Sequence, residues 1–283
     1  MMRVTTEKSK TLFIWLILFI LMLAIIFPVV WVLLTSFKPG RQVFTLPPVW
    51  VFTPTLDNYR YLFFESRFAL GVDILANMRN SLIAASSSTL LSIVVALYAA
   101  YALSRFRFKG KRAFSLFIIA TRMLPPIGTI IPFFLLINSM NLIDTHLALT
   151  IAYTALNVPL ATWMLRSFLD EVPVELDEAA IIDGCGRNGT LWRIITPLCA
   201  PGLVATTVFS FVLSWNDFAL ANVLTKRTAR TLPLVVSSFL TEEGVQWGPL
   251  SAAAMLVFLP PIILFMFTYR HLAKGLTLGA IKG

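Results

Sequence analysis

The sequence predicts an all-α integral membrane protein whose six helices cross the bilayer. Of its 283 residues, 58% are hydrophobic and 13% are charged, whereas soluble domains carry about 25% charged residues. Six long stretches are almost free of charge, and each is long enough for a helix to cross a hydrocarbon core, which needs roughly 20 apolar residues. The expected spans are residues 12–36, 80–103, 113–138, 147–168, 202–224 and 250–270.

The first stretch, residues 12–36, follows a short N-terminal segment. Its apolar run is longer than the roughly 7–15 residues of a signal peptide. No small-x-small cleavage pattern follows it. We therefore expect this stretch to be a permanent membrane helix.

Basic residues in the short connections predict the orientation. Ser104–Arg112 carries five basic and no acidic residues, whereas Asn138–His146 carries no basic residue. Because short cytoplasmic loops are enriched in Lys and Arg, the first connection is expected in the cytoplasm and the second outside the cell. An even number of spans then places both termini, residues 1–11 and 271–283, in the cytoplasm.

The net charge of +9 is explained by these membrane-flanking loops. Basic residues interleaved with aromatics do not occur outside them, so no nucleic-acid partner is expected. No Gly-x4-Gly-Lys-Ser/Thr phosphate loop is present, so the chain does not hydrolyse ATP by that route. Two cysteines and two histidines are too few for a disulfide scaffold or a histidine-rich metal site, and no metal site is expected.

The third stretch, residues 113–138, contains a single charge, Arg122. An arginine inside a membrane is costly and is by default a functional candidate. A structural ion pair, or snorkelling toward an interface, would also explain it. Pro125, Pro126 and Pro132 follow and must break backbone hydrogen bonds. They predict either a kinked packing helix or a gate beside a transport path.

Polar residues also lie inside the fourth and fifth stretches. Trp215, Asn216 and Asp217 stand in the middle of residues 202–224, and Asn157 lies in the preceding stretch. These side chains either line a polar route, with Trp215 as a stacking face, or join helices by hydrogen bonds. The sequence leaves both interpretations open.

The connection between the fourth and fifth spans, residues 170–200, is acidic where cytoplasmic loops are usually basic. Six of the fourteen acidic residues lie between Asp170 and Asp183. A helix lying on the bilayer surface would favour Lys and Arg instead, and anionic lipid would repel this one. We therefore expect a docking element for a cytoplasmic protein.

A helix–turn–helix is predicted within this loop. Pro173 suits the first turn of a helix, and Gly184 can adopt the left-handed conformation that ends one. Between them, an exposed face of small or apolar residues would let another surface approach closely: Leu176, Ala179 and Ala180. A second short helix is expected at about Thr190–Ile195 and would run to Pro197.

The loop contains a spaced motif formed by Glu178, Ala179, Ala180, Gly184, Ile194 and Pro197. This motif resembles the EAA loop of ABC importer permeases, usually written EAA-x3-G-x9-I-x-L-P, with Thr196 where leucine is usual. Four other segments are similar to the carbohydrate branch, in particular to the smaller permease of maltose-type transporters: Arg122-Met-Leu-Pro-Pro, Pro201-Gly-Leu, Ser214-Trp-Asn-Asp-Phe and the ending Gly275–Gly283. The resemblance covers about residues 12–283.

The resemblance implies a type I ABC importer permease fold in a bacterial plasma membrane. It implies four partners, namely a second homologous permease, two ATPase subunits and an extracytoplasmic substrate-binding protein. The EAA loop would sit in a cleft of the ATPase, with Glu178 paired to a basic group there and Gly184 forming the turn. The ATPase-coupling residues would be Glu178, Ala179, Ala180, Asp183, Gly184, Ile194 and Pro197. ATP and magnesium would bind in the partner ATPase, and this chain would hold no cofactor.

The resemblance also implies roles for the tail and the external segments. In the maltose-type smaller permease the ending reaches between the ATPase subunits. By this resemblance, the residues of the ending that would contact the ATPase are Gly275, Leu276, Gly279, Lys282 and Gly283. The larger permease of that family holds the main sugar contacts, so direct sugar contact by the candidates here stays open: Arg122, Asn157, Trp215, Asn216 and Asp217. Residues 38–79 and 225–249 would either pack on the partner permease or meet the binding protein.

The predicted function is that of a permease subunit in an ATP-driven carbohydrate importer. ATP binding would close the ATPase pair, and the docked loop would tilt the spans between inward- and outward-open states. A self-sufficient secondary transporter or channel is the alternative, although no repeat relates the first three spans to the last three. A membrane enzyme ranks last, because no nucleophile–base set stands at a membrane face. The sequence does not specify a disaccharide, an oligosaccharide or a polyol.

Overall fold

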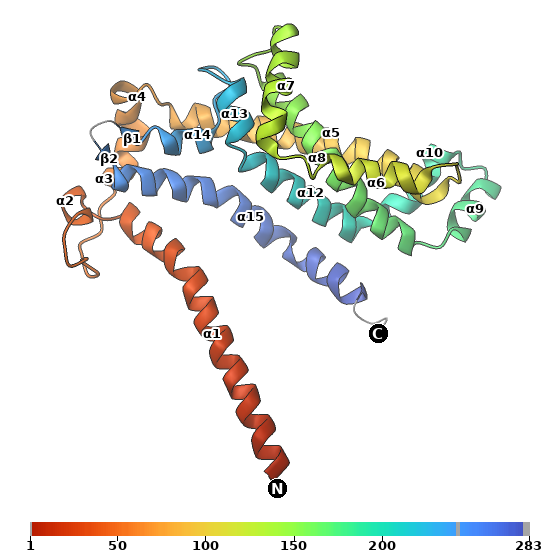
Figure 1. The fold of residues 1–283 in the computed structure, drawn as a ribbon, viewed down its shortest axis with the longest axis horizontal. Helices are drawn as coiled ribbons and strands as arrows, with labels where there is room; N and C mark the ends of the chain where they lie inside the picture. The colour runs from red at the N-terminus through yellow and green to blue at the C-terminus, as the bar shows by residue number, and fades with distance from the viewer. Residues whose placement is uncertain (1, 242–243, 280–283) are drawn as a thin grey trace. The chain divides into compact units, whose positions relative to one another are not determined.

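The computed structural model describes residues 2–241 and 244–279, and these are predominantly helical (Figure 1). Strands β1 (Leu240–Thr241) and β2 (Gly244–Val245) form one short antiparallel pair. The chain divides into two compact units, which are described separately. The first unit is Met1–Asp73 with Val236–Leu256, and the second is Ile74–Val235 with Val257–Gly283.

The first unit contains the long apolar helix α1 and a set of short helices. These are α1 (Met2–Ser36), α2 (Gly40–Val43), α3 (Asp57–Arg60), the π-helical turn η1 (Tyr61–Glu65) and α4 (Ser66–Ala69). The buried amide of Asn58 donates hydrogen bonds to the carbonyls of Ser36 and Lys38, at 2.9 and 3.0 Å. These carbonyls lie where α1 ends and would otherwise lack donors. The short helices therefore close the end of α1.

The second unit is built around α5, α8 and α12, whose packing dominates its interior (Figure 1). Its helical elements are α5 (Ile74–Arg105), α6 (Lys111–Thr121), α7 (Pro126–Ser139), α8 (His146–Glu171), α9 (Glu175–Ile182), α10 (Arg187–Thr190), η2 (Leu191–Ile195), α11 (Thr196–Leu198), α12 (Ala200–Trp215), α13 (Ala219–Leu224), most of α14 (Leu232–Ser237) and the larger part of α15 (Trp247–Gly279). The buried face of α5 is rich in small residues: Ala84, Ala85, Ser88, Ser92, Ala96 and Ala100. Small residues let helix backbones approach closely inside a membrane.

Four helices among the described residues are long and apolar enough to cross a membrane. They are Phe13–Ser36, Ile74–Arg105, His146–Glu171 and Trp247–Tyr269, and a bent pair of helices raises the number to five if it is counted as one span. The predicted spans 12–36, 80–103, 147–168 and 250–270 therefore lie within continuous helices.

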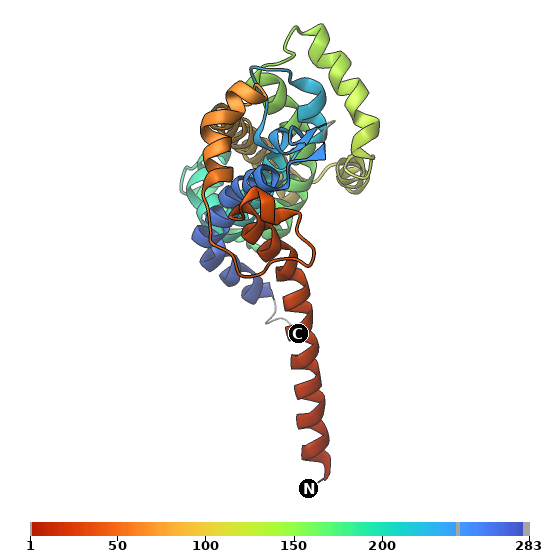
Figure 2. The ribbon, with the colours of Figure 1, turned by 90° about the vertical axis from the view of Figure 1, so that its left-hand side faces the viewer.

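The other two predicted spans are broken. Residues 113–138 divide into α6 and α7, which run in different directions (Figures 1 and 2). Pro125 and Pro126 cause the break, because proline lacks an N–H and disfavours a helical conformation in the residue before it. Residues 202–224 divide at 216–218, and the Asp217 carboxylate accepts the N–H groups of Leu220 and Ala221 at the start of α13. The membrane helices are thus interrupted where the sequence places its polar candidates.

Candidate functional sites

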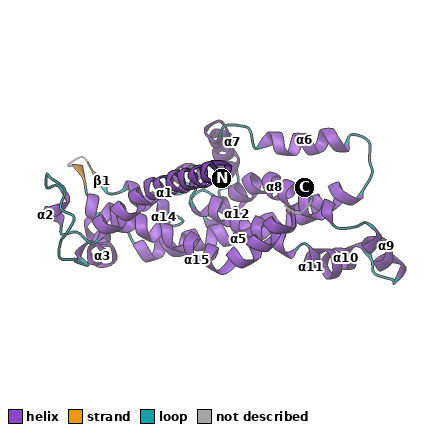
Figure 3. Ribbon diagram, turned by 90° about the horizontal axis from the view of Figure 1, so that it is seen from below, coloured by secondary structure: helices purple, strands orange, loops and turns teal. Residues whose placement is uncertain are grey.

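Residues 170–200 form a helix–turn–helix at one end of the second unit (Figure 3). The first turn of α9 carries Glu175, Asp177 and Glu178. Gly184 follows with φ +86°, the left-handed conformation that a glycine adopts without strain. The second helical run begins at Arg187 rather than Thr190 and continues through η2 and α11 to Leu198.

The accessible face of α9 agrees with the predicted one at Leu176 and Ala179, which are exposed, and differs from it at Ala180. Ala180, which was expected on that face, is only 3% exposed and lies beside the buried Asp177. The reason is that Asp177 turns inward to side chains of α5, and Ala180 lies one turn further along the same face. The outward surface combines carboxylates with apolar groups: Glu175, Glu178, Ala179, Ile182 and Asp183.

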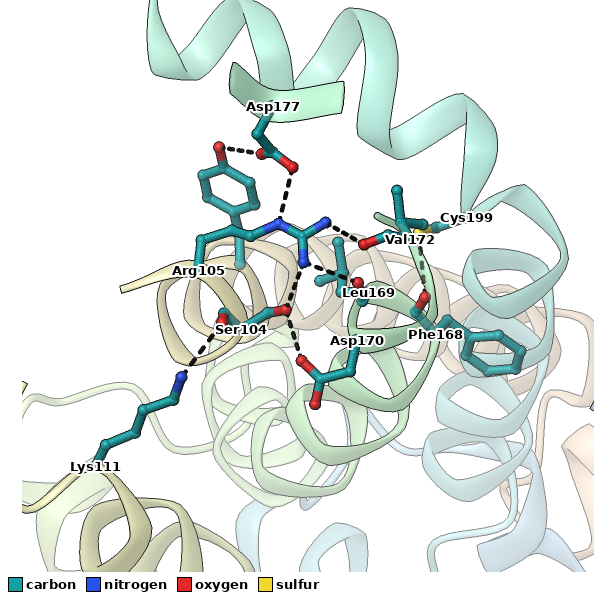
Figure 4. Close-up of polar contacts among 10 residues, drawn as sticks. Ser104, Arg105, Lys111, Phe168, Leu169, Asp170, Val172, Asp177 and Cys199 are labelled. Atoms are coloured by element: carbon teal, nitrogen blue, oxygen red, sulfur yellow. Dashed lines mark hydrogen bonds and ion pairs between the residues drawn. The ribbon is translucent and has the colours of Figure 1, made fainter. Parts of the chain in front are cut away.

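A buried ion pair joins α9 to the end of α5 (Figure 4). Arg105 Nε donates to Asp177 Oδ2 at 2.8 Å, and the Tyr101 hydroxyl donates to Asp177 Oδ1 at 2.8 Å. The guanidinium also donates to the carbonyls of Leu169 and Val172, at 3.2 and 2.9 Å, where α8 ends. One side chain thereby connects α5, α8 and α9. We call Tyr101, Arg105 and Asp177 the latch.

Further polar contacts surround the latch (Figure 4). Ser104 Oγ donates to Asp170 Oδ1 at 2.6 Å, and Lys111 Nζ donates to the Ser104 carbonyl at 3.2 Å. The Arg187 guanidinium lies 4.5 Å from the ring centroid of Phe106. The ends of α5, α6, α8 and α10 are therefore connected to one another at the base of the loop.

The second helix of the loop meets α12 at a bend of 85°. Next to this bend, Gly202 faces Phe168 of α8. A Cβ atom on Gly202 would lie 2.2 Å from Phe168 Cγ, far inside van der Waals contact. The close approach of α12 to α8 at this point therefore requires glycine.

A cavity of about 450 Å³ lies between α8, the break that separates α12 from α13, and the end of α6. Its polar lining contains four of the five pathway candidates: Arg122, Asn157, Asn216 and Asp217. Tyr153 also lines it. The two broken spans thus place their polar residues around one space.

Trp215 does not line this cavity. Its side chain is 1% exposed, its Nε1 donates to the Val257 carbonyl at 2.9 Å, and its ring stacks on Phe211 at 5.8 Å. The stacking face that the sequence suggested for a ligand is therefore occupied by the protein itself. The indole packs because its single N–H finds a carbonyl on α15.

Asn157 and Arg122 differ in how their polar groups are satisfied. Asn157 Nδ2 donates to Ser214 Oγ at 2.7 Å, and Ser88 Oγ donates to the same oxygen at 3.1 Å, so these residues join α5, α8 and α12. Arg122 is half-buried and interacts electrostatically with Asp217. Among the described residues it forms no hydrogen bond or ion pair through its side chain, so its guanidinium is available to the cavity.

A second polar cluster, which the sequence analysis missed, surrounds Asp144. Its carboxylate accepts the backbone N–H groups of residues 226–229 at 2.9 to 3.2 Å, and its own N–H donates to the Leu224 carbonyl. Asn80 donates to the carbonyls of Thr228 and Arg230, and its Oδ1 lies 2.8 Å from His146 Nε2. We call Asp144, Asn80 and His146 the clasp. Asp144 is the one charged residue of the connection 138–146, which is the signal that could have identified it.

Ionisation of Asp144 is favoured by this arrangement. Partial burial of the carboxyl opposes its ionisation, but the backbone N–H donors of residues 226–229 outweigh burial and lower the pKa of Asp144 to about 2. The Asp144 carboxylate of the clasp is therefore ionised at neutral pH.

Two further expectations concern metal ions, for which no site is predicted, and the C-terminal tail. Within residues 2–241 and 244–279, no group of three or more His, Cys, Asp or Glu side chains could hold a metal ion. Gly275, Leu276 and Gly279 lie in the last turns of α15, where the side chains are not described. Lys282 and Gly283 lie outside the described residues.

Long apolar helices, two of the predicted spans broken around a polar cavity, and an acidic helix–turn–helix braced against the helix ends define a membrane-embedded transport component. Residues 92–278 match the family described as binding-protein-dependent transport system inner membrane component, and the chain belongs to this family. It is therefore a multi-pass membrane protein that forms part of a transport system, and it is not itself an enzyme. The family assignment removes both the secondary-transporter and the membrane-enzyme alternatives.

Relatives of known sequence and structure agree with this assignment. The diacetylchitobiose uptake system permease protein DasC of Streptomyces coelicolor is 35% identical over 93% of this chain and 94% of its own length. The trehalose/maltose transport system permease protein MalG of Thermococcus litoralis is 34% identical, over 91% and 92% of the two chains. A chain of a bacterial ABC transporter that imports the acidic polysaccharide alginate shares the fold, with a TM-score of 0.76, 22% identity, and coverage of 94% and 97%.

Proposed function

We propose that this chain is the permease subunit of an ATP-driven importer for a carbohydrate in a bacterial plasma membrane. The observation that carries the proposal is α9, whose outward face offers carboxylates and Ile182 while its inward face is held by the latch. A helix fixed on one side and exposed on the other is suited to receive a partner. The relatives named for diacetylchitobiose and for trehalose and maltose support a carbohydrate as cargo.

The proposed assembly contains a second permease, two ATPase subunits and an extracytoplasmic binding protein. In it, ATP and magnesium act in the ATPase, and this chain contributes no cofactor site. The contact with the ATPase is formed by the EAA residues on and after α9, and residues 275–283 add a second contact. Closure of the ATPase pair moves α9, and the spans follow as rigid bodies between two states.

The proposed topology has six crossings with both termini in the cytoplasm. The two crossings that are not single helices are α6–α7 and α12–α13. Interrupted backbone is tolerated inside a membrane where it lines a cavity, and the 450 Å³ cavity lies at both breaks. We expect single cysteines in residues 104–112 to react with a membrane-impermeant reagent only from the cytoplasmic side, and cysteines in 138–146 only from outside.

The polar cavity is proposed as this chain's part of the translocation path. Arg122, Asn216 and Asp217 offer donors and acceptors to sugar hydroxyls, while Asn157 is partly engaged in joining helices. Proline-induced breaks beside Arg122 favour a gate over a merely kinked packing helix. Trp215 contributes to packing rather than to the path.

Reconstitution tests this function. The full complex in proteoliposomes, supplied with its binding protein and with diacetylchitobiose, maltose and trehalose in turn, should accumulate one of these sugars only when ATP is present. Uptake that survives loss of the ATPase and follows an ion gradient would refute the proposal.

A further inference from the structure

We propose that the latch transmits the movement of α9 to α5 and α8, so that Arg105 and Asp177 are positioning residues for ATP-coupled transport. This inference rests on the proposed function, because it assumes that a partner ATPase displaces α9. It assigns to these two side chains a role that the loop motif itself does not describe.

Helix α9 is attached mainly within its own loop. The helix spans only Glu175–Ile182, and its larger contacts are with α10 and η2, which belong to the same loop. Its outward face is left for the partner. The charged connection from α9 to the membrane helices is Asp177, which Arg105 and Tyr101 hold at 2.8 Å each.

The ion pair between Arg105 and Asp177 is buried. The side chains of Arg105 and Asp177 are 6% and 7% exposed, so separating them would leave an uncompensated charge away from water. Exposed pairs in the same chain are different: Arg67 and Asp73 are 70% and 39% exposed at 3.5 Å, and such pairs contribute little. The latch therefore stays closed when α9 is displaced, whereas a surface pair would open.

The Arg105 guanidinium contacts α8 as well as α9. Its two Nη atoms donate to the Leu169 and Val172 carbonyls at the end of α8, where the Leu169 carbonyl also accepts the Val172 N–H. A displacement of Asp177 consequently acts on α8 as well as on α5. Lysine carries the same charge but not this planar fork of donors, so it cannot hold all three elements at once.

The experiment compares variants of the full complex in proteoliposomes, with the binding protein and the panel of diacetylchitobiose, maltose and trehalose. The measured quantities are the ATPase subunits that co-purify and the sugar transported per ATP hydrolysed. We expect Asp177→Asn and Arg105→Lys to retain the ATPase, while sugar transported per ATP falls about tenfold, a typical size for a lost coupling. Tyr101→Phe should reduce the ratio less, because the Arg105–Asp177 contact persists.

The matched control is Asp73→Asn, which breaks an exposed ion pair and should leave both measured quantities at the wild-type level. An unchanged ratio in assembled Asp177→Asn complexes overturns the inference. Loss of the ATPase from both Asp177→Asn and Arg105→Lys complexes also overturns it, since the latch would then only shape the docking surface. Absence of ATP-driven uptake by the wild-type complex instead refutes the proposed function and this inference together.

Discussion

Two carboxylates in this chain are satisfied in opposite ways. Asp177 lies against an arginine and a tyrosine, so its charge is balanced by side chains. Asp144 receives only backbone N–H groups, and no cation forms an ion pair with it among the described residues. The first arrangement depends on the identity of its partners, whereas the second depends on the conformation of residues 226–229. Their responses to mutation and to pH should therefore differ.

Acid should weaken the clasp. Because the pKa of folded Asp144 is lowered to about 2, its ionised form stabilises the folded protein above the usual aspartate range, and this contribution is lost as the pH falls through the folded pKa. Thermal unfolding of the purified protein in detergent should show Asp144→Asn to be less stable than the wild type near neutral pH. The difference should shrink as the pH falls from about 4 to about 2. A stability difference between Asp144→Asn and the wild type that is independent of pH would contradict an ionised Asp144 in the clasp.

Reversal of the charge at Glu178 should uncouple the transporter. This side chain is exposed on α9 and is proposed to face a basic group of the ATPase, so Glu178→Lys would place like charges together. Sugar-stimulated ATP hydrolysis or retention of the ATPase should fall, while membrane insertion is unchanged. Glu65→Lys, an equal charge change at an exposed residue of the first unit, serves as the control. Normal coupling in the Glu178 variant would argue against α9 as the contact.

Residue patterns predicted some of these roles and missed others. The spacing of the motif singles out Glu178 and Gly184. Gly184 has the expected positive φ, whereas the contact of Glu178 with an ATPase stays a prediction. Ala180 was expected to be accessible, because a helical face read from sequence does not reveal which side turns inward. Arg105 was counted only as one basic residue among five in its loop. Besides the adjacent Ser104 hydroxyl, its guanidinium partners come from residues 64 to 72 positions away, and no local pattern contains that pairing.

At the scale of helices, close packing at Gly202 should be sensitive to one methyl group. Gly202→Ala would drive a Cβ into the Phe168 ring, and overpacking of this kind costs about 1–3 kcal/mol. The loss should exceed the gain that alanine usually brings to a helix interior. Phe168→Leu in the same chain should recover part of the stability, measured by thermal unfolding in detergent. No recovery in the double variant would show that the ring is not the obstacle.

Continuous helices were easier to predict than broken ones. The four helices found as expected are long apolar segments whose interior prolines do not divide them. Prolines in the third stretch signalled a disturbance, and the structure has two separate helices there. No proline stands at 216–218, and the signal for the break in the fifth stretch is instead that Asn216 and Asp217 interrupt an apolar run, with an aspartate placed where a helix can start. The break is stabilised by the Asp217 carboxylate at the start of α13.

At the scale of the whole molecule, family and function were accessible from sequence because the loop motif is long and lies between two apolar stretches, residues 147–168 and 202–224, the second of which is broken in the structure. The relatives and the family match confirm the resemblance to carbohydrate permeases. The composition predicted that the chain is a membrane protein, and the loop motif predicted that it belongs to a transport system. The polar cavity was not predictable as a cavity, since its lining comes from three stretches that only folding brings together.

Removal of the tail should separate coupling from insertion. A chain that ends before Gly275 retains every predicted span, so we expect normal insertion and normal amounts in the membrane. If residues 275–283 contact the ATPase as proposed, sugar-stimulated ATP hydrolysis should fall in the reconstituted complex. A chain with these residues replaced by an unrelated segment of equal length controls for length alone. Full stimulation in the truncated complex would refute a role for the tail.

The clasp has a practical consequence for labelling. Asp144 and Asn80 contact the backbone atoms of residues 226–230. The residues Lys226, Arg227 and Thr228 are exposed. The local conformation is thus indifferent to what these three residues are, apart from proline, which has no N–H to give. A fluorophore or a spin label attached at position 227 should therefore leave the hydrogen bonds of the clasp in place.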